Sequence, residues 1–354
     1  MDEAGLRAEL RAFVTPSAAR GLFAVFADVT VYLAAVALAM IVEATWARLA
    51  FAILAGIMIA ALFVLAHDAA HNSLTPLPRV NRLLAYFCMF PALHNPTLWR
   101  IEHHHFHHQA PNVKGLNSWS PVSYAEFQAM SPWRRRLERL YRSGLASGPY
   151  YLVERWWRAK LFPRASALLA PAVRGAAVRD LILLLAWFVL FGVALVLAAE
   201  RNADPSPGLA LTYGFAVPFA VWNVMMGYTV YFQHTHPQVP WFRTRDEADA
   251  FGGQHQRTVT ILHSRLWGLL THEIMEHNAH HVHPLIPHYR LRAAQRRLRA
   301  LAVPTFLAER LTPAYIVDVN RRCKLYDYEG HCWLDFDGRP TSAPCATVPR
   351  SATA

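Results

Sequence analysis

Four long apolar segments constrain the fold of this chain more than any other feature of its sequence. They cover residues 22–42, 49–69, 181–199 and 209–232. A helix that crosses a bilayer needs about 20 apolar residues, and each segment is close to that length. Because lipid offers no hydrogen-bond partners to a bare backbone, such segments have to be helical. The sequence therefore predicts an all-α integral membrane protein with about four transmembrane helices.

The predicted spans pair into two hairpins, because the link within each pair is short. A fifth apolar stretch, residues 83–98, contains Pro91 and Pro96. We expect this stretch to be re-entrant or interfacial, because prolines and polar residues make a full span unfavourable. The remaining long regions, residues 100–176 and 233–354, are polar or amphipathic.

Lysine and arginine are distributed unevenly between the two ends of the predicted spans. Residues 100–176 contain twelve of them and residues 233–354 contain fifteen, whereas the two short links contain one each. The positive-inside rule therefore places both termini and both basic regions on the cytoplasmic side. We expect residues 1–354 to form a single membrane domain with a helical cap on that side.

The excess of basic residues does not indicate a nucleic-acid-binding protein. The formal net charge is +11, but 54% of the residues are hydrophobic and the basic residues lie between apolar spans. Contact with anionic membrane lipid explains this distribution. The four cysteines form no Cys-x-x-Cys pair, so the sequence predicts neither a disulfide framework nor a thiolate metal site.

Histidines gather in three short motifs at or just beyond the predicted cytoplasmic ends of the apolar segments. The motif HDAAH covers residues 67–71, HHHFHH covers residues 103–108 and HNAHH covers residues 277–281. Side chains three or four positions apart share a face of an α-helix, so His103 and His107 are expected to face one site. The adjacent histidine points about 100° away and is available to a second metal ion.

The number and type of these side chains indicate a metal centre for two ions. Neutral imidazole is a common ligand of iron, copper and zinc, and the lack of thiolates argues against an iron–sulfur cluster. Residue chemistry alone leaves the choice among iron, copper and zinc open. The alternative explanation is that these are three unrelated surface clusters of histidine. It would require a coincidence at three places in the sequence.

The three motifs resemble the histidine boxes of the membrane fatty-acid desaturase and hydroxylase superfamily. Two further stretches, YFQHTHPQVPW at residues 231–241 and HVHPLIPHYR at residues 281–290, resemble the omega-6 (delta-12) fatty-acid desaturase group. The resemblance implies two non-haem iron ions held in the cytoplasmic cap. Its implied ligands are His67, His71, His103, His107, His108, His234, His277, His280 and His281.

Two of these ligand positions have an alternative. Desaturases of the family often have two residues between the first and second histidines of the second box, whereas His103 and His107 are separated by three. His104 has the shorter spacing and is the alternative to His103, and His236 is the alternative to His234. Acidic neighbours of the boxes are expected to accept imidazole N–H bonds. These neighbours are Asp68, Glu102, Glu273 and Glu276.

The function that the resemblance implies is O2-dependent insertion of a cis double bond into a fatty acyl lipid or an acyl thioester. Acyl or alkane hydroxylation is an alternative, as is a carotenoid ketolase or hydroxylase. A histidine-rich metal transporter is an alternative from another class. The sequence has no Gly-x-Gly-x-x-Gly fingerprint and no cysteine set for a ferredoxin domain. An external ferredoxin or cytochrome b5-like electron donor is therefore expected.

The acyl chain is expected to lie along residues 83–98 and the fourth span. In that span Asn223, Gly227 and the pair Met225 and Met226 interrupt the usual leucine and valine filling. Close packing between helices explains the methionines and glycine equally well.

Overall fold

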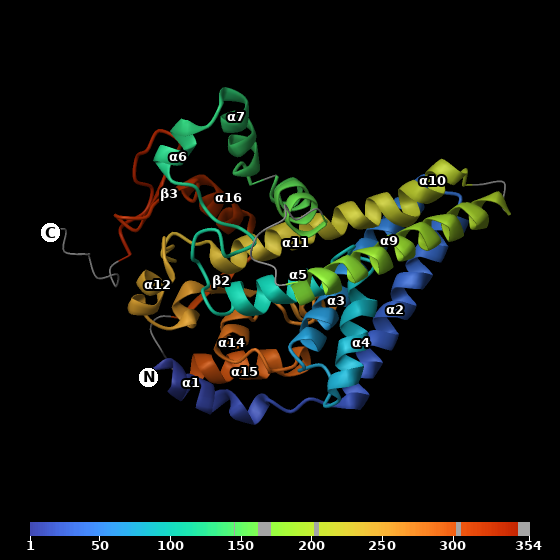
Figure 1. Ribbon diagram of the computed structural model, residues 1–354, viewed down its shortest axis with the longest axis horizontal. Coiled ribbons are helices and arrows are strands. Elements are labelled where there is room, and N and C mark those ends of the chain that lie inside the picture. Colours follow the sequence, from blue (N-terminus) through green and yellow to red (C-terminus); the bar gives the residue numbers. More distant parts are fainter. Residues whose placement is uncertain (145, 162–170, 202–204, 302–305, 346–354) are drawn as a thin grey trace.

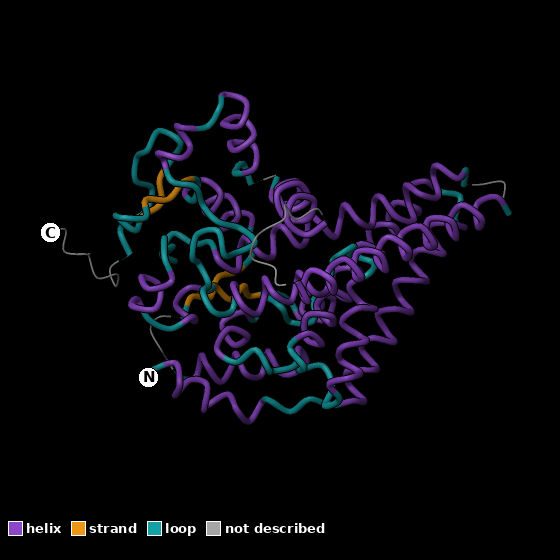
Figure 2. The backbone as a smooth tube through the Cα atoms, viewed as in Figure 1, coloured by secondary structure: helices purple, strands orange, loops and turns teal. Residues whose placement is uncertain are grey.

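The structure is a computed structural model that describes residues 1–144, 146–161, 171–201, 205–301 and 306–345. The two predicted cytoplasmic regions also include residues outside this description, namely 145, 162–170, 302–305 and 346–354. Helices dominate the described residues, and strands are confined to two small patches in the left half of the view (Figure 2).

Four long apolar helices confirm the predicted membrane architecture. The first hairpin consists of α2 (Ala18–Ile41) and α3 (Thr45–Ala70). The second consists of α9 (Pro171–Glu200) and a composite helix. That helix comprises α10 (Pro207–Leu211), a π-helical turn (Thr212–Ala216) and α11 (Val217–His234). Figure 1 shows α2, α9 and α11 extending to one side of the molecule, and each predicted span falls on one of the four.

The segment expected at the membrane interface forms the end of one short helix and the start of another. These are α4 (Pro78–Met89) and α5 (Pro96–Ile101). A helix as short as α4 spans about 18 Å, which is too little for the hydrocarbon core. Its Ala85 and Cys88 are buried against the core that includes α3, while Leu83 and Phe87 on another face are exposed. This amphipathic pattern is that of an interfacial helix.

The remaining helices form a cap around the ends of α3 and α11, at the left of Figure 1. The cap contains many short elements because its sequence is interrupted by proline, glycine and polar residues. Its α-helices are α1 (Glu3–Leu10), α6 (Tyr124–Ala129), α7 (Pro132–Tyr141), α8 (Ser147–Tyr150), α12 (Arg245–Phe251), α13 (Arg265–Leu270), α14 (His277–Val282), α15 (His288–Ala300) and α16 (Pro313–Arg322). Two further π-helical stretches cover Glu102–His107 and Tyr151–Leu161, and 3-10 turns cover Arg11–Phe13 and Gln254–Arg257.

Two small sheets in the cap were not expected from the sequence. Strand β1 (Val259–Leu262) pairs in parallel with β2 (Leu307–Arg310), with Val259 opposite Leu307. Strand β3 (Leu325–Asp327) pairs antiparallel with β4 (Cys332–Leu334). Each strand has at most four residues, so its hydrophobic pattern is too short to stand out in the sequence.

The N-terminal helix covers the helix that bears the third histidine box. Leu6 and Leu10 of α1 pack with Ala279 and Val282 of α14 in one apolar cluster, which Leu291 of α15 completes. All five side chains are fully buried. The third box is therefore held inside the cap by apolar contacts on its outer side.

Candidate metal centre

Nine histidines from four segments of the chain converge in two adjacent clusters. The first cluster consists of His67, His71, His103, His108 and His280, whose ligand atoms lie within 4.8 Å of one another. The second consists of His107, His234, His277 and His281, within the same limit. The rings of His108 and His281, one from each cluster, have centroids 4.7 Å apart. The structure thus brings together every residue predicted as a metal ligand.

The end of α3 supplies two members of the first cluster. His67 lies in the last turn of the helix and His71 is the residue that caps it. Their ring centroids are 4.7 Å apart, as expected for side chains four positions apart on one face. The first box therefore has the local geometry that its spacing predicts.

The second box adopts a π-helical turn rather than an α-helical one. The backbone N–H of His108 donates to the carbonyl of His103 at 2.9 Å, which is the five-residue spacing of a π-helix. His103 and His108 consequently face the same cluster, with their Nε2 atoms 3.0 Å apart. His107 belongs to the second cluster. This differs from the α-helical expectation, which placed His103 and His107 at one site.

The two alternative ligands lie outside both clusters of described residues. The ring of His104 stacks obliquely near His71, with centroids 4.3 Å apart, and burial lowers the pKa of His104 to about 4. The Nε2 atom of His236 lies 3.5 Å from Glu309. The geometry therefore favours His103 and His234 over these alternatives.

The third box lies on α14 and contributes to both clusters. His280 belongs to the first cluster, whereas His277 and His281 share the second and have Nε2 atoms 3.1 Å apart. Buried Asn278 anchors this six-residue helix, because its side-chain amide donates to the carbonyl oxygens of His255 and Thr258. The anchoring residue Asn278 therefore lies between two ligand positions, His277 and His280.

Buried amide side chains orient two rings of the second cluster. His107 Nδ1 lies 2.9 Å from the Oδ1 of Asn117, and His234 Nδ1 lies 2.9 Å from the Oδ1 of Asn112. The amide nitrogens of both asparagines donate to backbone carbonyls, so their oxygens face the rings. Each ring must then donate its Nδ1–H, which leaves the Nε2 lone pair directed at the cluster.

A third amide and one carboxylate complete this outer layer. His281 Nδ1 lies 3.2 Å from the Oε1 of Gln254. Asp68 lies 3.3 Å from the Nδ1 of His67, and its other oxygen accepts from both the backbone and the ring of His288, at 2.7 and 3.0 Å. Asp68 is thus placed to orient a first-cluster ring, as its position beside His67 predicted.

The other acidic residues near the boxes form ion pairs with arginine. These pairs are Glu102 with Arg155 at 2.6 Å, Glu273 with Arg292 at 2.9 Å, and Glu276 with Arg299 at 3.5 Å. Sequence reasoning favoured carboxylates beside the boxes and missed the three amides. For two of these amides, Asn112 and Asn117, the only signal in the sequence was their position within ten residues of the second box.

The spacing of the ring nitrogens fits bound metal ions. His108 Nε2 lies 3.0 Å from the Nε2 atoms of both His103 and His280. A bond between a metal ion and imidazole is about 2.1 Å, so ligands at right angles on one ion have nitrogens about 3 Å apart. His71 Nε2 is buried and has no hydrogen-bond partner among the described residues. An unpaired buried nitrogen is costly, and coordination would satisfy it.

The protonation state of the clusters also suits metal binding. Burial lowers the pKa of His108, His280 and His281 well below the usual range, and neighbouring imidazoles lower it further. These rings are therefore neutral near pH 7, and a neutral imidazole is the form that binds metal.

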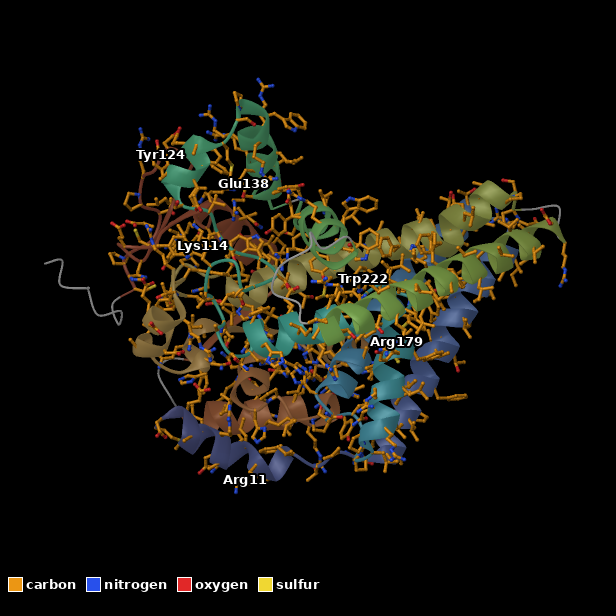
Figure 3. All side chains as sticks on the ribbon, in the orientation of Figure 1. Arg11, Lys114, Tyr124, Glu138, Arg179 and Trp222 are labelled. Atoms are coloured by element: carbon orange, nitrogen blue, oxygen red, sulfur yellow. The ribbon has the colours of Figure 1, made fainter. Side chains whose placement is uncertain are left out.

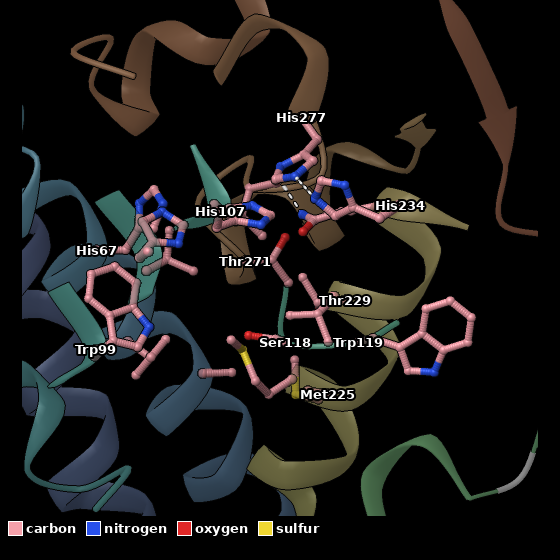
Figure 4. A pocket seen from close by; sticks show the side chains of 18 of the residues that line it. His67, Trp99, His107, Ser118, Trp119, Met225, Thr229, His234, Thr271 and His277 are labelled. Atoms are coloured by element: carbon pink, nitrogen blue, oxygen red, sulfur yellow. Dashed lines mark hydrogen bonds between the residues drawn. The ribbon is translucent and has the colours of Figure 1, made fainter. Parts of the chain in front are cut away.

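An apolar cavity extends from the histidines to the membrane-spanning helices (Figure 4). His67, His107 and His277 line one part of it, and Figure 4 shows Met225 on the side away from His277. Its other lining residues include Ala60, Phe63, Val64, Trp99, Trp222, Met226 and Thr229. Much of the wall is thus formed by α3 and α11, and the rest includes Trp99 of α5 and, outside the long helices, Ser118, Trp119 and Thr271.

One expectation about this cavity is wrong, and the glycine in the fourth span has the packing role that was offered for it as an alternative. Residues 83–98 do not line it among the described residues. His94 of this stretch lies behind two rings that do line it, with centroids 5.0 Å from Phe63 and 4.9 Å from Trp222. Gly227 is a packing position, since a Cβ there would lie 2.2 Å from the carbonyl oxygen of Ser147. Met225 and Met226 do line the cavity, whereas buried Asn223 donates to the carbonyl of Phe219 in its own helix.

Comparison with known proteins identifies related sequences. The profile of the fatty acid desaturase family matches residues 44–312. A relative from Nostoc, named sn-1 acyl-lipid omega-3 desaturase (ferredoxin), is 28% identical over 289 residues, which cover 80% of this chain and 76% of the relative. A Synechocystis protein named sn-1 oleoyl-lipid 12-desaturase is 28% identical over 282 residues, which cover 77% of this chain and 74% of that relative.

Proposed function

Because the chain belongs to the fatty acid desaturase family, whose members are oxidoreductases, we propose that it inserts an omega-6 (delta-12) cis double bond into a fatty acyl chain. One observation carries the proposal: two clusters of neutral histidines border an apolar cavity between membrane-spanning helices. The omega-6 assignment rests on the residues 231–241 and 281–290, and a relative named as a 12-desaturase supports it.

We propose that the two clusters hold two non-haem iron ions. The first ion would be bound by His67, His71, His103, His108 and His280, and the second by His107, His234, His277 and His281. When bound, these ions supply activation of dioxygen, which no amino-acid side chain provides. In the overall reaction, O2 takes two hydrogens from the acyl chain, two electrons from the external donor and two protons from water, and is released as two water molecules.

The side chains around the clusters have their own tasks in this proposal. Phe63, Trp222 and Met225 keep the acyl methylenes beside the histidines and exclude water from them. Asn112 and Asn117 keep the Nε2 lone pairs of their histidines directed inward. Positioning of one methylene pair is what selects the carbon atoms that lose hydrogen.

We further propose that the substrate is the acyl chain of a membrane lipid and that an acidic ferredoxin or a cytochrome b5-like protein supplies electrons. The Nostoc relative, named as an acyl-lipid desaturase with ferredoxin in its name, supports both points, and the relative named as an oleoyl-lipid desaturase supports the first. Residues 1–354 would act as one membrane domain, with the termini and histidine boxes on the cytoplasmic side. The lysines and arginines on that side would attract an acidic carrier.

Expression in a host rich in monounsaturated lipid tests the reaction. Mass spectrometry of total fatty acids should show a new diene with its added double bond at the delta-12 position. A hydroxy acid would assign acyl hydroxylation, and an altered carotenoid with unchanged acyl chains would exclude acyl chemistry altogether.

Single substitutions test the metal site in the same host. His281→Ala should abolish the new product and lower bound iron in the purified protein, because it removes a second-cluster ligand. His105→Ala is the matched control, since this exposed histidine lies in the same box but outside both clusters. Full activity of His281→Ala would refute the ligand assignment.

A further inference from the structure

A basic hollow opens between α4, α5 and the first turns of α9. Its lining includes Arg82 and Tyr86 of α4, Arg100 of α5, Arg179 of α9, and His105 just beyond α5. It shares no lining residue with the acyl cavity. Figure 3 labels Arg179 near the place where these three helices meet.

A buried carboxylate behind the lining holds the wall of this hollow together. Asp180 of α9 is fully buried and accepts hydrogen bonds from the hydroxyl of Tyr86 at 3.1 Å and from the backbone N–H of Thr97 at 3.0 Å. It also pairs with Arg179 at 3.0 Å. One side chain therefore ties the three helices together and fixes Tyr86 and Arg179 at the edge of the hollow.

The charge of the hollow suits an anion. Asp180 neutralises Arg179, but Arg82 and Arg100 have no ion-pair partner among the residues that the structure describes. No carboxylate belongs to the described lining. Guanidinium groups bind phosphate oxygens through two parallel N–H bonds, so this arrangement favours a phosphate group.

The surroundings of the hollow indicate where that phosphate comes from. Leu83 and Phe87 of α4 are 69% and 49% exposed, and Val178 and Ile182 of α9 are 51% and 62% exposed. In a membrane protein such apolar residues contact lipid, and arginines beside them lie at headgroup level. A soluble acidic protein would have to displace lipid to reach the same place.

We propose that this hollow binds the phosphate group of a membrane phospholipid, with Arg82 and Arg100 as its main ligands. The apolar lining, which includes Ala85, Met89 and Val173, would contact the glycerol and upper acyl region. This inference does not depend on the reaction at the histidines.

Binding of phosphatidylglycerol to the full-length protein in detergent, followed by native mass spectrometry, tests the proposal. The double variant Arg82→Gln with Arg100→Gln should weaken binding about 25-fold, because each interfacial arginine contributes about fivefold. The variant with lysine at both positions should bind within about fivefold of the unmodified protein, since the charge remains.

The matched control is the double variant Arg79→Gln with Arg174→Gln. Both arginines are exposed, lie on α4 and α9, and do not line the hollow. Binding should stay within about twofold of the unmodified protein, and all variants should keep the same helical circular dichroism. An equal loss in the control, unchanged binding in the first variant, or displacement of the lipid by inorganic phosphate would each overturn the proposal.

Discussion

Neutral amides and a single carboxylate orient the histidine rings, and this distinguishes the two clusters. Asn112, Asn117 and Gln254 contact rings of the second cluster, whereas Asp68 contacts a ring of the first. A carboxylate partner raises the basicity of a ligating imidazole more than an amide does. We therefore expect the two ions to differ in ligand strength.

Replacing Asp68 tests this distinction. Asp68→Asn keeps the shape of the side chain but removes the charge that faces His67 and His288. Loss of such an outer partner typically costs about 10–100-fold in metal affinity or activity. Iron content and diene formation should both fall, while the exposed control Asp337→Asn should leave them unchanged. Normal iron content in Asp68→Asn would show that the contact has no orienting role.

The choice between two adjacent histidines of the second box gives another prediction. His103→Ala should lower bound iron and abolish the product, because His103 contributes a ligand atom to the first cluster. His104→Ala should retain iron and most activity, because His104 lies outside both clusters. Iron analysis of the two purified variants checks this, and the reverse result would assign the ligand to His104.

At the scale of elements, a π-helical turn decides how the second box serves two ions. In an α-helix His103 and His107 would share a face, and His108 would point away. The extra residue in the turn pairs His103 with His108 and directs His107 to the other cluster. Such turns are rare in proteins overall but occur often at functional sites. The sequence contains no separate signal for one.

Close packing of α11 against α8 is the second decisive feature at this scale. A Cβ at Gly227 would lie 2.2 Å from the carbonyl of Ser147, and one at Gly148 would lie 2.7 Å from the Cα of Val224. The two glycines therefore allow the short helix α8 to lie directly on the membrane-spanning helix. The same contact leaves Met225 and Met226 on the cavity side.

Gly227→Ala should destabilise the protein by about 1–3 kcal/mol, because the added methyl group overpacks a backbone contact. Gly192→Ala is the control, since its Cβ would meet only a leucine methyl group at 3.9 Å, and alanine favours the helix. The thermal midpoint in detergent should fall for Gly227→Ala and stay level or rise for Gly192→Ala. Equal midpoints for both variants would contradict the packing role of Gly227.

At the scale of the whole molecule, a side-chain hydrogen bond joins a membrane helix to the cap. Asp28 of α2 lies inside a predicted span and is 2.5 Å from the Nε2 of His272 in the cap. The ring of His272 in turn contacts His288, which hydrogen-bonds Asp68. An acidic residue in an apolar helix is thus paired where the helix meets the cap, next to the first histidine cluster.

Cysteine labelling tests the proposed orientation. Ser206 is exposed just before α10, so the thiol of Ser206→Cys should react only from the non-cytoplasmic side. Arg136→Cys in the cap should react only from the cytoplasmic side. Cys345→Ser removes the one native cysteine that is not buried. If an impermeant reagent labelled Ser206→Cys from the cytoplasm, the protein would have the opposite orientation in the membrane.

The membrane class, the four spans and the convergence of the three histidine boxes followed from the sequence, whereas His234 was implied only by the family resemblance. Span length and hydropathy are local properties, and imidazoles at helical spacing have few structural explanations, so both could be predicted residue by residue. The family resemblance added iron and the acyl substrate as expectations.

The division of those histidines between two clusters, and the choice of the groups that orient them, depend on long-range contacts in the folded chain. Asn112 reaches His234 across 122 positions, and Asp68 reaches His288 across 220. Such contacts depend on how α3, α11 and α14 are brought together by apolar packing, which no local pattern encodes. The cluster that receives each imidazole follows from that packing and from one π-helical turn, because spacing along the chain defines a face but not its partner.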